Sequence, residues 1–190
     1  MTVGKEGAQM ENPFEVFRGV LASNAAAGFR WGSMTFPDED HGSVVLRSHY
    51  HALKKVFEDW RLPRDPESGD YKGSLEDMKK HYAAASERLG FAVLPPEPVV
   101  NGIGYQALQK KDTVRALEFF HYNVATYPES ANVYDSLGDG LEAAGKLDEA
   151  LASFTKAANA GEKSGDPNAE AFRKNADRLR EKLGKATPPK

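Results

Sequence analysis

The most regular feature of the chain is a pattern of small and apolar residues that occurs twice within Val100–Ala157, at a spacing of 34 residues. The matching positions are Gly104 and Gly138, Ala116 and Ala150, and Phe120 and Phe154. A period of about 34 residues is typical of stacked pairs of antiparallel helices. The small residues let the helices approach closely, and the aromatic residue fills the space between successive pairs. We therefore expect two helical hairpins over residues 99–162.

This pattern resembles the tetratricopeptide repeat, with Pro128 at the position of the repeat's terminal proline and Glu162 at that position in the second copy. In such modules the first helix of each hairpin lines a concave groove that binds a partner. The resemblance assigns this groove to Asn101, Tyr105, Gln109, Asp135, Asp139 and Glu142. Its second half is acidic, so it would repel a carboxylate and favour a basic or neutral peptide. The alternative is that the groove packs against residues 1–94 and binds no other molecule.

Helical segments flank the two hairpins. Ser74, with Asp77 three residues later, predicts a capping box at the start of a helix that stops at Gly90. It lies within a linker and connecting segment, 61–98. Residues 163–190 form a capping region, with a helix over Ala169–Leu183 and a frayed tail at Lys185–Lys190.

Residues 1–60 have a different pattern, which predicts the order strand, helix, strand, helix. The expected elements are a strand at Met1–Val3, a helix over Pro13–Ala27, a strand over Phe29–Phe36 and a helix over Ser48–Trp60. Asn12 is the expected cap of the first helix. This order indicates a parallel crossover. The predicted fold class is therefore mainly α, with an N-terminal β-α-β-α segment followed by helical hairpins.

The polar loop after the second predicted strand contains His41, and sites in open α/β sheets lie at the carboxyl ends of parallel strands. The segments Val3–Glu6, Glu39–Val44 and Leu53–Trp60 resemble the C-terminal end of an esterase branch of the α/β-hydrolases, which includes enterochelin esterases and esterase D. Some members of that branch also have a tetratricopeptide-like tail. The resemblance implies that His41 is the general base of a catalytic triad and that Glu6 is the acid that orients it.

The sequence lacks the nucleophile that this chemistry requires. No Gly-x-Ser-x-Gly elbow occurs in the 190 residues, and Ser43 is only two residues from His41 in the same loop. We therefore expect a C-terminal hydrolase remnant that is inactive alone, joined to a module for protein contact or self-assembly. Two alternatives are an active carboxylic-ester hydrolase whose serine lies outside this chain, and a free-standing repeat adaptor.

Composition excludes several other classes of function. The 25 basic and 28 acidic residues leave a net charge of −3, which favours neither nucleic acid nor an anionic membrane as partner. The chain has no cysteine, no phosphate-binding glycine loop and no apolar run of the roughly 20 residues that span a bilayer. His49 and His51 face different directions on a helix, so no metal site is expected. We expect no cofactor and, if the chain is complete, a cytoplasmic location.

A two-stranded parallel sheet is too small to bury both of its faces. The apolar side chains of the second predicted strand, Phe29, Trp31, Met34 and Phe36, should therefore need a cover. We expect either a homo-oligomer or the missing part of a hydrolase to provide it.

Overall fold

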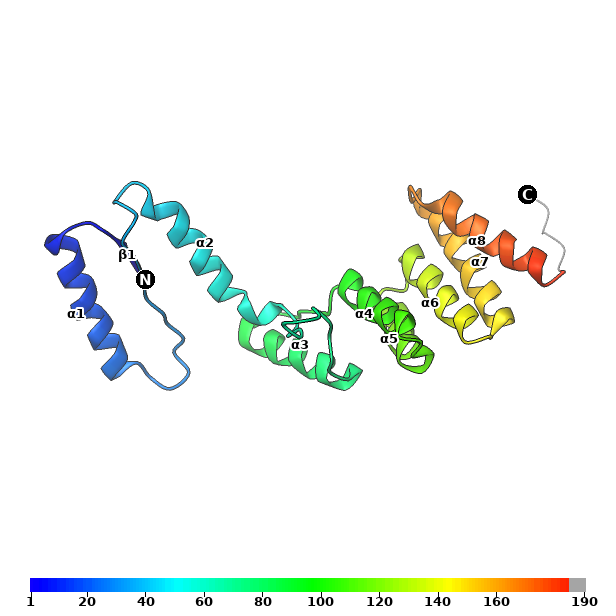
Figure 1. Cartoon of the computed structure of the whole chain (residues 1–190), viewed down its shortest axis with the longest axis horizontal. Helices are drawn as coiled ribbons and strands as arrows, with labels where there is room; N and C mark the ends of the chain where they lie inside the picture. The colour runs from blue at the N-terminus through cyan, green and yellow to red at the C-terminus, as the bar shows by residue number, and fades with distance from the viewer. Residues whose placement is uncertain (185–190) are drawn as a thin grey trace. The chain divides into compact units, whose positions relative to one another are not determined.

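The computed structural model of this chain describes residues 1–184, with the side chain of Asp59 excepted. Within these residues the fold is mainly α, with eight α-helices and two short strands, and it divides into two compact units, Met1–Arg61 and Leu62–Lys190 (Figure 1). The predicted frayed tail at 185–190 lies outside the described residues. The boundary between the two units lies after Arg61, one residue later than the boundary expected between residues 60 and 61.

The first unit is built on two short parallel strands. Strand β1 (Thr2–Gly4) pairs with β2 (Met34–Phe36) in the register Thr2 to Met34 and Gly4 to Phe36. Helices α1 (Ala8–Asn24) and α2 (Val44–Val56) both contact β1 and lie on either side of the strands in Figure 1. The buried apolar side chains of this unit are Val3, Phe14, Phe36 and Val44.

The predicted order of elements in this unit is correct, but their bounds are wrong. Helix α1 begins at Ala8 instead of Pro13, because the carboxylate of Glu11 accepts hydrogen bonds from the amides of Glu6 and Gly7 and takes the capping role expected of Asn12. Pro13 lies inside the helix, where it removes one main-chain hydrogen bond.

The remaining bounds of the first unit also shift. The second strand is confined to Met34–Phe36, and α2 begins at Val44 instead of Ser48. It ends at Val56 and is followed by a short 3-10 turn, η1 (Glu58–Trp60). Phe36 is buried within the unit, and the Arg47 guanidinium lies over its ring at 4.6 Å from the ring centre. The expectation that Phe36 needs an external cover is therefore wrong, whereas Phe29 and Met34 are exposed.

The second unit begins with a connecting segment and α3 (Leu75–Leu89). The predicted capping box is confirmed, because the Ser74 hydroxyl accepts from the Asp77 amide and the Asp77 carboxylate accepts from the Ser74 amide. Gly90 ends the helix in the left-handed conformation, with φ of 74°. One face of α3, which includes Met78 and Tyr82, packs in a core with residues that precede and follow the helix in the chain. The other buried members of this core are Leu62, Tyr71, Val93, Val100, Ile103 and Phe119.

Two helical hairpins follow, α4 (Glu97–Gln109) with α5 (Thr113–Thr126), and α6 (Ala131–Ala143) with α7 (Leu147–Ser164). In the first hairpin a Cβ atom at Gly104 would come closer than 3.0 Å to the ring of Phe120. In the second hairpin a Cβ atom at Gly138 would meet the ring of Phe154 at 2.5 Å. Each glycine therefore provides the space that the phenylalanine of its own hairpin occupies, and the two hairpins use the same contact.

The turns of the two hairpins also match. Lys111 has φ of 61°, and Gly145, which is 34 residues later, has φ of 76°. Glycine adopts this left-handed conformation readily, whereas lysine has a Cβ atom that disfavours it. The same turn is therefore formed by two residues with different conformational preferences.

Helix α8 (Ala169–Lys182) ends one residue before the predicted bound. Its buried residues are Phe172, Ala176, Leu179 and Arg180, and it packs against α7 (Figure 1). The opposite face is charged, as expected of a helix that closes a stack.

Candidate functional site

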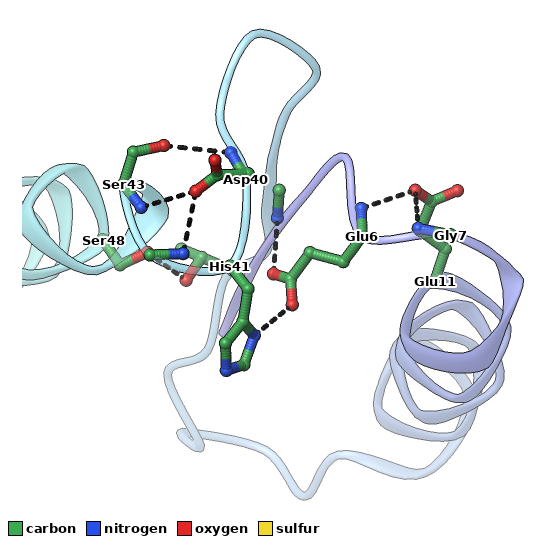
Figure 2. A network of polar contacts seen from close by, with 10 residues as sticks. Glu6, Gly7, Glu11, Asp40, His41, Ser43 and Ser48 are labelled. Atoms are coloured by element: carbon green, nitrogen blue, oxygen red, sulfur yellow. Dashed lines mark hydrogen bonds and ion pairs between the residues drawn. The ribbon is translucent and has the colours of Figure 1, made fainter.

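The two side chains expected to form a catalytic pair lie in contact. Glu6 follows β1 and His41 follows β2, so both come from the carboxyl ends of parallel strands (Figure 2). The Nδ1 atom of His41 is 2.6 Å from Oε2 of Glu6. The Glu6 side chain is 7% exposed, whereas that of His41 is 83% exposed. The carboxylate is therefore held inside the unit and the imidazole extends into solvent.

Close approach of the loop to β1 brings this pair together. A Cβ atom at Gly4 would lie 2.6 Å from the Glu39 carbonyl oxygen, so only glycine leaves room for the loop. The Lys5 amide donates to the same carbonyl at 2.6 Å, which fixes the loop beside the strand. The Gly4 amide donates to the other carboxylate oxygen of Glu6 at 3.1 Å, which orients the carboxylate toward His41.

The conformation of the loop itself depends on Asp40. Its carboxylate accepts from the amides of Gly42 and Ser43 at 2.8 and 2.9 Å, and the Ser43 hydroxyl accepts from the Asp40 amide (Figure 2). This local network gives His41 a defined position without burying it. It also engages the Ser43 hydroxyl.

The pair is electrostatically coupled. The hydrogen bond to Glu6, together with its charge, raises the pKa of His41 above the ordinary value of 6.5. The hydrogen bonds from His41 and from the Gly4 amide lower the pKa of Glu6. When the imidazole is neutral, a carboxylate at Nδ1 favours the tautomer with the proton on that nitrogen and leaves Nε2 as an acceptor. This is the geometry of a general base.

Four of the six expected groove residues have polar partners within the second unit. The Tyr105 hydroxyl donates to the Asp139 carboxylate at 2.7 Å, and Asn175 donates to Asp135 at 2.9 Å. Glu142 forms ion pairs with Arg178 at 2.6 Å and Lys182 at 3.2 Å. Gln109 is exposed and Asn101 is half-buried. The groove was expected to have an open acidic second half, but α8 supplies partners to two of its three acidic residues.

The three acidic residues have different electrostatic environments. Burial raises the pKa of both Asp135 and Asp139. The Arg178 hydrogen bond lowers the pKa of Glu142 to about 2. The groove residues that sequence reasoning missed are Asn175, Arg178 and Lys182. Their spacing of three and four residues places them on one face of α8 and could have indicated a polar contact.

No metal site is found, because the described residues contain no group of three histidine or acidic side chains that could hold an ion. No helix of the described part of the chain is long and apolar enough to cross a membrane.

Comparison with known proteins identifies no family. No family model matches the chain, and no curated protein matches it. Among solved structures, a chain of the CopN-Scc3 complex is similar, with 19% sequence identity over 90% of this chain and 86% of that one. The TM-score of that match is 0.36, which supports no conclusion about fold or function.

Proposed function

We propose that this chain is the C-terminal part of a serine-esterase-like α/β-hydrolase, inactive alone, joined to a tetratricopeptide-like module for protein contact. The observation that carries the proposal is the hydrogen bond between His41 and Glu6 at the carboxyl ends of two parallel strands. In α/β-hydrolases the triad follows the chain order serine, acid, histidine. Glu6 and His41 have the order of the last two members.

The pair can act as a base, but the two serine hydroxyls drawn near it in Figure 2 are engaged by other groups. The Ser43 hydroxyl is engaged by the Asp40 amide, and the Ser48 oxygen accepts from the Thr2 hydroxyl at 2.6 Å. Without an attacking serine and oxyanion donors, most of the stabilisation of an acyl-transfer transition state is absent. We therefore expect the chain alone to have no esterase turnover.

Hydrolysis of p-nitrophenyl acetate by the purified chain, compared with His41→Ala, tests this expectation. We expect the two proteins to differ by less than about tenfold, since an isolated imidazole is a weak catalyst in water. A fluorophosphonate probe should leave the chain unlabelled. His41-dependent multiple turnover, or probe attached to a serine of this chain, would contradict the proposal.

The alternative, an active hydrolase completed by residues outside this chain, has a separate test. A reading frame that continues upstream of Met1 and encodes a Gly-x-Ser-x-Gly elbow would be expressed with this segment. Labelling of that serine by the probe, lost in His41→Ala, would favour the active enzyme over the inactive remnant.

The second part of the proposal, protein contact through the hairpins, rests on the glycine–phenylalanine contact that both hairpins share. Because α8 already neutralises Glu142 and donates to Asp135, the exposed end of the groove lies at Gln109, the one exposed residue of the six. We expect a neutral peptide to bind there. Amide shifts of α4 on titration with uncharged and basic peptides test this, and shifts confined to α1 and α2 would argue against it.

A further inference from the structure

Arg47, the fourth residue of α2, connects three parts of the first unit near the candidate site. Its Nη1 atom lies 2.6 Å from Oδ2 of Asp38 and 2.9 Å from Oε1 of Glu39, two acidic residues of the loop that follows β2. Its guanidinium also covers the ring of Phe36, the last residue of β2, at 4.6 Å from the ring centre. One side chain of α2 therefore contacts both the end of β2 and the loop that leads to His41.

The same loop is fixed on its other side by the end of β1. The main-chain carbonyl of Glu39 accepts a hydrogen bond at 2.6 Å from the amide of Lys5, which directly precedes Glu6. The Glu39 side chain is 18% exposed, so its ion pair with Arg47 is sheltered, whereas the Asp38 side chain is 68% exposed. Glu39 is thus held by α2 through its carboxylate and by the residue after β1 through its carbonyl.

The position of His41 depends on this loop. Its imidazole extends into solvent, and within the described part of the chain the hydrogen-bond partner of the ring is Glu6, at 2.6 Å (Figure 2). No surrounding core holds the ring, so the contact forms only while the loop backbone keeps it beside the carboxylate. The Asp40 carboxylate shapes the turn, but it bonds to the amides of Gly42 and Ser43 in the loop itself. It does not attach the loop to the strands.

We propose that Arg47 is a positioning residue for the His41–Glu6 pair, which acts by clamping Glu39 between α2 and the end of β1. This role rests on the proposed function only in that His41 is taken as the base, because the clamp and the pair exist without ester hydrolysis. Arginine suits the clamp better than lysine, because its planar guanidinium can contact two carboxylates and an aromatic face in one fixed geometry.

Removal of Arg47 distinguishes positioning from a purely electrostatic role. Loss of a nearby positive charge alone would leave the pKa of His41 unchanged or raise it, because a cation disfavours the imidazolium. Release of the loop would instead separate His41 from Glu6, and the pKa of His41 would fall toward its ordinary value of 6.5. The charged groups that act directly on His41 are Glu6 and Asp40, and both are kept when Arg47 is replaced. The two roles therefore predict different directions.

An NMR titration of the His41 ring protons in the full chain tests the proposal. Arg47→Met removes both ion pairs and the contact with Phe36, and it should lower the pKa of His41 by at least half as much as Glu6→Gln does. Arg47→Lys keeps the charge but not the planar group, so its value should be intermediate. Lys55→Met is the matched control, because it removes another paired cation of α2, and it should leave the pKa of His41 unchanged.

The amide spectrum of α1 and α2 shows whether the first unit of each variant is folded. If Arg47→Met unfolds it, Arg47→Lys decides, and a His41 pKa equal to that of the unchanged protein would then overturn the proposal. In a folded Arg47→Met variant, an unchanged or raised His41 pKa would also overturn it, as would an equal decrease in Lys55→Met. Neither esterase turnover nor probe labelling enters this readout, so the clamp and the proposed function can fail separately.

Discussion

The coupling between Glu6 and His41 depends on a difference in burial between two side chains that are in contact. The carboxylate is sheltered and fixed by the Gly4 amide, whereas the imidazole is held mainly by the carboxylate. The charged pair therefore stabilises the fold most between the ordinary pKa of a glutamate, 4.5, and that of a histidine, 6.5. Its contribution declines as rising pH deprotonates His41 or as falling pH protonates Glu6.

Glu6→Gln should lower the pKa of His41 toward its ordinary value, because the substitution removes the negative charge beside the imidazolium. An NMR titration of the His41 ring protons measures this directly. Glu58→Gln is the matched control, since Glu58 pairs with Lys55 and Arg30. A His41 pKa that responds equally to both substitutions would show that the 2.6 Å contact is absent in solution.

The ion pairs of Glu142 should give a dependence of stability on pH. Its pKa is lowered to about 2, so its contribution is present above the ordinary value of 4.5 and is lost as the pH falls toward about 2. Because Arg178 is half exposed, we expect no more than about 1 kcal/mol. The free energies of unfolding of the unchanged chain and of Glu142→Gln, measured by urea denaturation, should differ at pH 7, and the difference should shrink as the pH falls toward about 2. A constant difference across that range would contradict this assignment.

At the level of helices and strands, the hairpins were the most predictable part of the chain. The pair Gly104 and Phe120 recurs 34 residues later as Gly138 and Phe154, so the interpretation of one hairpin supports that of the other. The signals for the two ends of α3, Ser74 and Gly90, were equally informative, because each end is fixed by residues within a few positions along the sequence.

Predictions failed where distant or unusual contacts decide an element. The start of α1 depends on Glu11 reaching back to two amides, whereas Pro13 suggested a later start. The partners of Glu142 and Asp135 come from α8, 36 and 40 residues away, and no local pattern specifies that approach. For the His41–Glu6 pair, the resemblance suggested the two residues. Their separation along the sequence does not by itself predict that their side chains lie 2.6 Å apart, because that depends on the pairing of β1 with β2.

Gly104→Ala should destabilise the second unit, because its new Cβ atom would overlap the buried Phe120 ring. We expect a loss of about 1–3 kcal/mol in the free energy of unfolding. Gly102→Ala, on the same helix but with no atom within 4 Å of its new Cβ, should gain about 0.5–1 kcal/mol from helix propensity. Chemical denaturation of both variants measures the difference, and similar effects of both substitutions would contradict the tight contact.

At the scale of the whole molecule, the two units differ in how much apolar surface they bury. Four apolar side chains are buried among the described residues of Met1–Arg61, whereas the second unit contains three buried clusters. A small unit with so small a core is marginally stable. Its stability should therefore be lower than that of the helical unit.

Native-state hydrogen exchange should reveal this difference. We expect amides of α1 and α2 to exchange at least about a hundredfold faster than those of α5 and α7, which corresponds to about 2.7 kcal/mol in opening free energy. Equal protection of α1 and α5 in dilute protein would contradict this ranking.

The left-handed residue that closes each hairpin makes the two repeats unequal in energy although they are alike in shape. Lys111 bears a conformational cost of about 1 kcal/mol that Gly145 avoids. The two hairpins thus keep the same turn conformation although only the second has glycine at the left-handed position. The first hairpin holds its turn through main-chain hydrogen bonds from Lys111 to Leu108 and from Asp112 to Ala107, as the second does with less strain. The loop at Lys111 should therefore be the first in the repeat array to open.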